Sequence, residues 1–228
     1  GKLAALGQMS AAIAYEINQP IAAIQNNVLN CGSFLKEDKD CDLDQSLTEI
    51  SSLTEKMGVI TGQLKNFARK SSLKIKPTDV GKAINKASHL VQPVFKAQGI
   101  DVLINTAAEK MLIAGDETRL EQVFVNLYRN AIDAMQGING KKVVHVEASI
   151  IGDRVNVVVS DTGTGFEDHV LSKLYDPFFT TKSNNESLGL GLSITYGIIK
   201  DLKGEIQASN NSDGGACFVL SFPRYIEK

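Results

Sequence analysis

The stretch NLYRNAIDA, residues 126–134, carries polar and apolar side chains at helical spacing. On a helix, Asn126, Asn130 and Asp133 fall at i, i+4 and i+7 and therefore share one face. Amide and carboxylate oxygens aligned in this way suit Mg²⁺, which binds oxygen ligands, water and phosphate. A solvated helix face would show the same pattern, so the stretch by itself predicts a helix and leaves the cation site open.

A second motif, Asp161-Thr162-Gly163-Thr164-Gly165, directly follows a predicted strand at Val155–Ser160. The glycines permit a tight turn and a close approach of the backbone to a ligand. A carboxylate at the end of a strand can accept a hydrogen bond from an exocyclic amine of a base. An ordinary turn between a strand and a loop can contain the same residues.

Two further motifs suit phosphate. Gly189-Leu190-Gly191-Leu192 precedes an apolar helix, and backbone N–H groups at a helix N-terminus bind phosphate. Upstream, Pro177-Phe178-Phe179-Thr180-Thr181-Lys182 offers Lys182 as a point charge for a phosphate. Each motif also has a plain explanation, a loop before a helix and a pair of packed aromatic rings beside a surface lysine.

The composition is that of an ordinary globular protein, with 43% hydrophobic and 22% charged residues in a chain of 228. A net charge of -2 gives no reason to expect nucleic acid or an anionic membrane as a partner. The three cysteines lack metal-site spacing, which favours reduced thiols in the cytosol. The sequence opens in a helical pattern without a signal peptide or membrane span, so we expect a fragment whose membrane segments, if any, lie in absent N-terminal regions.

Residues 1–76 are predicted to form two long helices joined by a polar loop at Lys36–Asp40, the second running from about Asp44 to about Lys70. Apolar residues recur every three or four positions along both helices. Pro20 interrupts the first helix and is expected to bend it. Because one hairpin buries little surface, we predict a homodimer through residues 1–76, in which two hairpins form a four-helix bundle. Packing of both stripes against the rest of the same chain is the alternative.

Residues 77–228 are predicted to be a second domain of mixed type, which makes the chain an α+β protein. Helices are expected near residues 80–97, 117–136 and 190–202. Strands are expected at Asp101–Thr106, Val143–Ile151, Arg154–Ser160, Glu205–Ser209 and Ala216–Phe222. Elements in this order predict an α/β sandwich, a mixed sheet covered on one face by helices.

The order of the four motifs resembles the N, G1, F and G2 boxes of the GHKL ATPases. The resemblance implies a Bergerat-type ATP-binding domain in which Asn130 holds Mg²⁺, Asp161 binds the adenine amine, and Gly189 and Gly191 lie beside the phosphates. ATP and Mg²⁺ are therefore the expected cofactors. The expected nucleotide-binding residues are Asn126, Asn130, Asp133, Asp161, Gly163, Gly165, Thr180, Thr181, Lys182, Gly189, Leu190, Gly191 and Leu192.

Residues 7–20, GQMSAAIAYEINQP, resemble the H box of sensor histidine kinases, and with the FFTTK segment at 178–182 they look like the branch of C4-dicarboxylate sensors. The resemblance implies the cytoplasmic part of a dimeric kinase anchored in a bacterial inner membrane. It would phosphorylate its own histidine and pass the phosphoryl group to a receiver-domain aspartate of a response regulator. The implied catalytic positions are 15, Glu16 and Gln19, with Gln19 placed to position a water for dephosphorylation of the regulator.

The sequence departs from this family at Tyr15, where the family has the phosphate-accepting histidine. A phenol with a pKa of about 10 is almost wholly protonated at neutral pH and is a poor nucleophile. We therefore expect the chain as given to be deficient in autophosphorylation. Tyr15 is either a substitution introduced into an active kinase or the mark of a natural pseudokinase that binds a regulator as an ATP-dependent scaffold. A plain GHKL ATPase is a further alternative, which the N-terminal hairpin disfavours.

Overall fold

The computed structural model describes residues 10–37, 40–68, 75–181, 189–212 and 214–226. The chain divides into two compact units, Gly1–Ser71 with Thr180–Leu190, and Ser72–Phe179 with Gly191–Lys228. A domain boundary between residues 76 and 77 stays a prediction.

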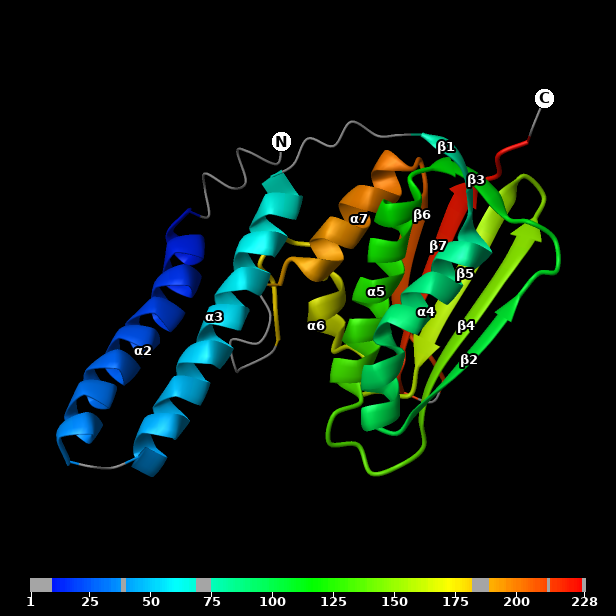
Figure 1. Cartoon of the computed structure of the whole chain (residues 1–228). Coiled ribbons are helices and arrows are strands. Elements are labelled where there is room, and N and C mark those ends of the chain that lie inside the picture. The colour runs from blue at the N-terminus through cyan, green and yellow to red at the C-terminus, as the bar shows by residue number, and fades with distance from the viewer. Residues whose placement is uncertain (1–9, 38–39, 69–74, 182–188, 213, 227–228) are drawn as a thin grey trace. The chain divides into compact units, whose positions relative to one another are not determined.

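The first unit contains two helices that pack against each other, α2 (Ser10–Glu37) and α3 (Asp40–Ala68) (Figure 1). Pro20 lies buried within α2, which continues on both sides of it. The prediction of a loop at Lys36–Asp40 was wrong at both ends, because α2 extends through Glu37 and α3 begins at Asp40. Acidic residues are favourable in the first turn of a helix, so Asp40 starts a helix where we expected a loop.

Apart from Pro20, the described apolar side chains of α2 and α3 are partly buried or exposed. Ile17, Ile21 and Ile24 of the predicted stripe are half-buried, whereas Val28 is 55% exposed and Leu29 is 70% exposed. The described hydrophobic core contains no residue before Val80. The hairpin therefore leaves an apolar surface that the described residues do not cover.

The second unit is built on a five-stranded sheet in the order β2-β4-β5-β7-β6, with β2 and β4 parallel and the other pairs antiparallel. Its strands are β2 (Ile100–Thr106), β4 (Lys142–Ile151), β5 (Arg154–Asp161), β6 (Glu205–Asn210) and β7 (Ala216–Pro223). These match the predicted strands to within one residue at each end. A separate pair, β1 (Lys76–Asp79) with β3 (Leu112–Gly115), was not predicted.

Helices α4 (Val80–Ala97), α5 (Glu117–Ala134) and α7 (Gly191–Asp201) cover one face of this sheet (Figure 1). The short helix α6 (Asp168–Leu171) follows β5. Along β5, Val155, Val157 and Val159 are buried while their neighbours are half-buried, as expected when one face of a strand packs on helices. The predicted α/β sandwich is thus confirmed, and no described helix is long and apolar enough to cross a membrane.

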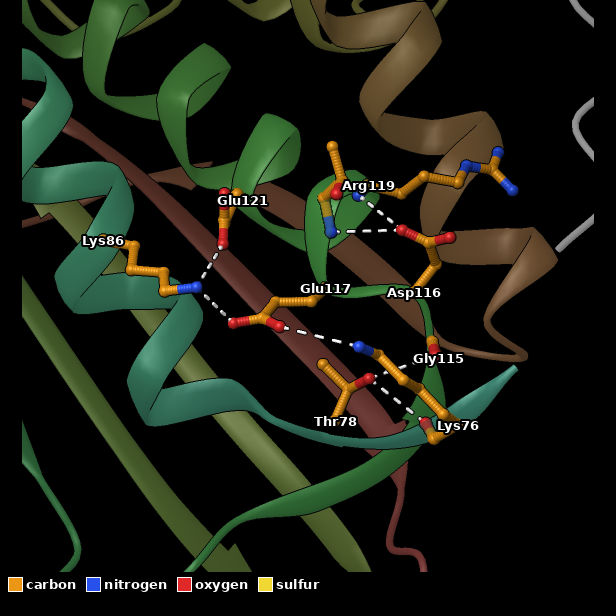
Figure 2. A network of polar contacts seen from close by, with 9 residues as sticks. Lys76, Thr78, Lys86, Gly115, Asp116, Glu117, Arg119 and Glu121 are labelled. Atoms are coloured by element: carbon orange, nitrogen blue, oxygen red, sulfur yellow. Dashed lines mark hydrogen bonds and ion pairs between the residues drawn. The ribbon is translucent and has the colours of Figure 1, made fainter. Parts of the chain in front are cut away.

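A polar network fixes the beginning of α5 (Figure 2). Asp116 caps the helix by accepting hydrogen bonds from the backbone N–H groups of Thr118 and Arg119, at 3.1 and 3.3 Å. The Nζ atom of Lys86, on α4, lies 2.6 Å from Glu117 Oε1 and 3.4 Å from Glu121 Oε1. These exposed ion pairs add little stability individually, but together they hold α4 and the start of α5 in one arrangement.

Candidate functional site

Helix α5 carries the polar face that the sequence predicted. Asn126, Asn130 and Asp133 are all half-buried, next to the buried face that contains Leu127 and Ala131. Asn126 donates from Nδ2 to the carbonyl oxygen of Gly191 at 3.1 Å and lies 3.3 Å from Thr195 Oγ1. Because both partners belong to α7, Asn126 fixes the position of the glycine that begins this helix.

Asn130 has a buried side-chain amide nitrogen, Nδ2, without a hydrogen-bond partner among the described residues. A buried polar atom left unpaired costs about 1–3 kcal/mol, so such an atom calls for an explanation. Rotation of the amide by a half-turn exchanges its nitrogen and oxygen, so the same point can present a carbonyl oxygen to a cation. Asn130 therefore suits a ligand that supplies the missing partner.

Asp161 is the last residue of β5 and lies on the face of the strand that packs on the helices. It is a buried polar residue, with 6% of its surface exposed. Its Oδ1 accepts hydrogen bonds from Gly163 N at 2.8 Å and Ala216 N at 3.2 Å. Burial raises the pKa of the Asp161 carboxyl above its ordinary value, and these two N–H donors oppose that rise. Since both bonds go to Oδ1, Oδ2 remains as the acceptor for a donor from outside the described chain.

The loop after Asp161 packs on the end of α5. Thr164 donates from its backbone nitrogen to the carbonyl oxygen of Ala134 at 3.2 Å. A Cβ on Gly163 would lie 2.7 Å from Ala134 Cβ and 2.7 Å from Asp161 Oδ1, so only glycine permits this approach. Gly165, with φ of 66°, takes the left-handed conformation that glycine adopts without strain. The polar face of α5 and the carboxylate of Asp161 are thereby joined in one site.

Gly191 has a different setting. Apart from Gly191 itself, its two neighbours in the chain and the nearby backbone of α7, no described atom lies within 4 Å of the position that a Cβ on Gly191 would occupy. Glycine at this position is therefore not required by packing within the described chain. Among the described residues, nothing occupies the space at this Cβ position, and a ligand there would lie beside the first turn of α7.

The roles of several other predicted site residues stay predictions. Thr180, Thr181, Gly189 and Leu190 belong to the first compact unit, and Lys182 lies outside the described residues. Leu192 is partly buried and packs against the hydrophobic core, and its predicted place beside the nucleotide stays a prediction.

The predicted phosphotransfer positions lie on α2. Tyr15 and Glu16 are within this helix, although their side chains lie outside the described part of the chain, and Gln19 is exposed one turn further on.

Two residues of the site escaped the sequence analysis. Asn210, the last residue of β6, and Asn211, the first residue after it, bond to the loop that begins at Asp161. A run of asparagine, serine and glycine between two strands signals a turn, and nothing in its composition points to contacts with a loop more than forty residues earlier.

Known proteins with similar sequences are ATPases and sensor proteins. The family described as histidine kinase-, DNA gyrase B- and HSP90-like ATPases matches residues 115–226. The C4-dicarboxylate transport sensor protein DctB of Pseudomonas aeruginosa is 35% identical over 220 residues, covering 96% of this chain and 36% of that protein. Sensor protein FixL of Bradyrhizobium diazoefficiens is 32% identical over 225 residues, covering 97% of this chain and 44% of that protein.

Among solved structures, histidine kinases are similar to this chain. Histidine kinase ThkA, in its complex with response regulator protein TrrA, matches with a TM-score of 0.76 and 27% identity, over 98% of this chain and 63% of that one. The catalytic domain of ThkA alone matches with a TM-score of 0.59 and 28% identity, over 66% of this chain and 96% of that domain.

Residues 115–226 therefore form a GHKL-type domain of the histidine kinase-, DNA gyrase B- and HSP90-like ATPase family, whose members bind ATP. Over most of its length the chain is similar to parts of sensor histidine kinases, and C4-dicarboxylate sensors are among these relatives. It spans less than half the length of DctB and FixL.

The raised pKa of Asp161 predicts how stability depends on pH. The folded chain holds the proton of Asp161 to a higher pH than the unfolded chain does, so stability falls as pH rises from the unfolded pKa, about 3.9, through the folded pKa. Asp161→Asn keeps the acceptor for Gly163 and Ala216 and removes the charge. We expect this variant to be more stable than the unmodified chain at about pH 7, by a margin that narrows as the pH is lowered.

Urea unfolding of both chains across this pH range measures the margin, with Asp101→Asn on the exposed face of β2 as control. A margin that is independent of pH, or a variant that is less stable at neutral pH, would contradict the assignment of a buried charge to Asp161.

Proposed function

We propose that this chain is the catalytic core of a sensor histidine kinase and binds Mg²⁺-ATP between α5, the loop after Asp161 and the start of α7. The observation that carries the proposal is the position of α5, which bonds to both other segments. Asn126 Nδ2 donates to Gly191 O, and Ala134 O accepts from Thr164 N. Three motifs far apart in the sequence thus border one helix.

Base recognition is assigned to Asp161. Its open Oδ2 suits the exocyclic amine of adenine, which donates a hydrogen bond, and it repels the carbonyl oxygen of guanine or hypoxanthine. The backbone N–H of Gly163 keeps Oδ1 occupied, so the carboxylate has one free direction in which to accept. Thr162 supports this loop by donating from Oγ1 to the carbonyl oxygen of Lys141 at 3.0 Å.

Asn130 is the residue that would hold Mg²⁺, because its buried amide lacks a partner among the described residues. No described cluster of three acidic, histidine or cysteine side chains is placed to bind a metal. That fits Mg²⁺, which takes few protein ligands and completes its shell with water and phosphate oxygens. When bound, the ion would neutralise charge on the phosphates, and Asn126 would keep the N-terminus of α7 facing them.

Gly191 offers a test of the phosphate position. Gly191→Ala should leave the fold intact or stabilise it by up to about 1 kcal/mol, since alanine is the better helix former and no described atom opposes its Cβ. If phosphates lie beside α7, the added methyl group takes up their space. We expect at least a ten-fold loss of affinity for Mg²⁺-ATP (roughly 1.4 kcal/mol) and unchanged affinity for adenosine, both measured by titration calorimetry. Equal loss for both ligands would place the phosphates elsewhere.

Phosphoryl transfer is assigned to α2. In the family reaction, a neutral imidazole nitrogen at position 15 forms a bond to the γ-phosphorus while the bond to the β-phosphate oxygen breaks, releasing ADP. Glu16 orients the imidazole and takes its proton. Tyr15 cannot serve in this way at neutral pH, because its phenol stays protonated. The natural acceptor of the phosphoryl group would be a receiver-domain aspartate of a response regulator in the cytoplasm, with Gln19 near the dephosphorylating water.

The direct test compares three chains incubated with γ-labelled Mg²⁺-ATP. The unmodified chain should take up no label, Tyr15→His should take up label that is lost in acid, and Tyr15→His with Asp161→Asn should lose most of that label. Label in the unmodified chain would contradict the role of Tyr15. No label in Tyr15→His would favour the second candidate, a scaffold that binds a regulator without phosphotransfer.

A homodimer through α2 and α3 is part of this proposal. It is supported by the partial exposure of every described large apolar side chain of the hairpin, with Val28 as an example at 55%. In a four-helix bundle these side chains would face a second copy. Val28→Glu should shift the sedimentation of the chain from dimer to monomer, while Gln25→Glu, also exposed, should not. A monomeric unmodified chain would exclude the bundle.

A further inference from the structure

The end of β6 and the turn that follows it contact the nucleotide loop through two consecutive amide side chains, Asn210 and Asn211. Asn210 donates from Nδ2 to the carbonyl oxygen of Phe166 at 2.8 Å and accepts from Phe166 N at 2.7 Å through Oδ1. One side chain thus satisfies both backbone groups of a residue that lies 44 positions earlier. Asn210 holds the far end of the loop that begins at Asp161.

Asn211 holds the near end of the same loop. Its Nδ2 donates to the carbonyl oxygen of Asp161 at 2.8 Å, and its Oδ1 accepts from Gly215 N at 2.9 Å. Its backbone nitrogen donates to Gly215 O at 2.7 Å, so the turn is closed by main chain and side chain together.

These bonds continue the sheet where its ladder stops. The pairing of β5 with β7 ends at Ser160 and Cys217, one residue before Asp161. At the next position, Ala216 N donates to the side chain of Asp161 at 3.2 Å, while the Asp161 carbonyl is bonded by Asn211. At Asp161, hydrogen bonds that involve side chains therefore replace the backbone pairing of β5 with β7. The first residue of β7 bonds to the Asp161 carboxylate instead of to the Asp161 backbone.

We propose that Asn210 and Asn211 are positioning residues for the nucleotide, which hold Asp161 and the glycine loop in the geometry that selects adenine. An ordinary turn asparagine bonds to backbone groups one to four residues away. These two amides bond to residues 44 and 50 positions distant. Each amide donates from its nitrogen and accepts at its oxygen, whereas an ionised carboxylate of similar size can only accept.

The inference rests on the proposed function, and the test separates the two. The affinities of the unmodified chain and of Asn211→Ala are measured by calorimetry for three ligands, Mg²⁺-ATP, Mg²⁺-ITP and tripolyphosphate. ITP carries an oxygen in place of the adenine amine, and tripolyphosphate carries no base. A residue that positions Asp161 should affect selection of the base, and a residue that only stabilises the domain should affect all three ligands.

We expect Asn211→Ala to lose at least ten-fold in affinity for ATP, with little change for ITP and tripolyphosphate, so that the ATP-to-ITP ratio falls toward one. Asn105→Ala, exposed on β2, is the matched control and should keep the ratio of the unmodified chain. A retained ratio in Asn211→Ala, or an equal loss for all three ligands, would overturn the inference while the proposed function stands. An unmodified chain that binds no ATP would overturn both.

Circular dichroism checks that Asn211→Ala folds. If it does not, Asn210→Ala takes its place, since this change frees only the end of the loop at Phe166 and leaves the bond to Asp161. The expected result is then a smaller fall in the ATP-to-ITP ratio, and an unchanged ratio would overturn the inference.

Discussion

A carboxylate buried at the end of a strand is the constraint on which this domain depends. Asp161 lies on the face of β5 that carries three buried valines, where a charge is costly to desolvate. Two backbone N–H groups offset that cost at Oδ1, and they come from different segments, the glycine loop and β7. A protein that needed only stability would place an apolar residue here, so the charge points to a ligand.

The surrounding structure follows from holding that carboxylate. Gly163 permits the loop to touch Ala134, and this contact sets the distance between Asp161 and the polar face of α5. From the same helix, Asn126 bonds to the first residue of α7. The capped and ion-paired start of α5 anchors the helix at its other end. One helix thus connects the proposed base-binding carboxylate, the proposed Mg²⁺ ligand and the proposed phosphate position.

Much of this arrangement could be predicted from the sequence because it is periodic. The alternation along Arg154–Asp161 and the helical spacing of Asn126, Asn130 and Asp133 gave both the elements and the faces on which these residues lie. The pair of β1 and β3 escaped prediction because each strand has four residues, too few to show a period, and β1 contains Pro77. Asn210 and Asn211 escaped because their role depends on the tertiary contact of a turn with a distant loop.

The phosphate acceptor poses a separate question from the nucleotide site. In the proposed reaction Tyr15 stands where the nucleophile is needed, while the residues around Asp161 have a geometry that suits the proposed ATP site. Both explanations of Tyr15, a kinase with one substitution and an ATP-dependent scaffold, require that the nucleotide site work. The central claim is therefore that Asp161 binds the adenine base, whatever happens at position 15.

Titration of Mg²⁺-ATP into the unmodified chain and into Asp161→Asn tests that claim most directly. The account predicts measurable binding to the unmodified chain and a loss of about a hundred-fold or more in the variant, because a donor amide then faces the donor amine of adenine and leaves both unpaired. Equal affinity of the two chains for ATP would contradict it.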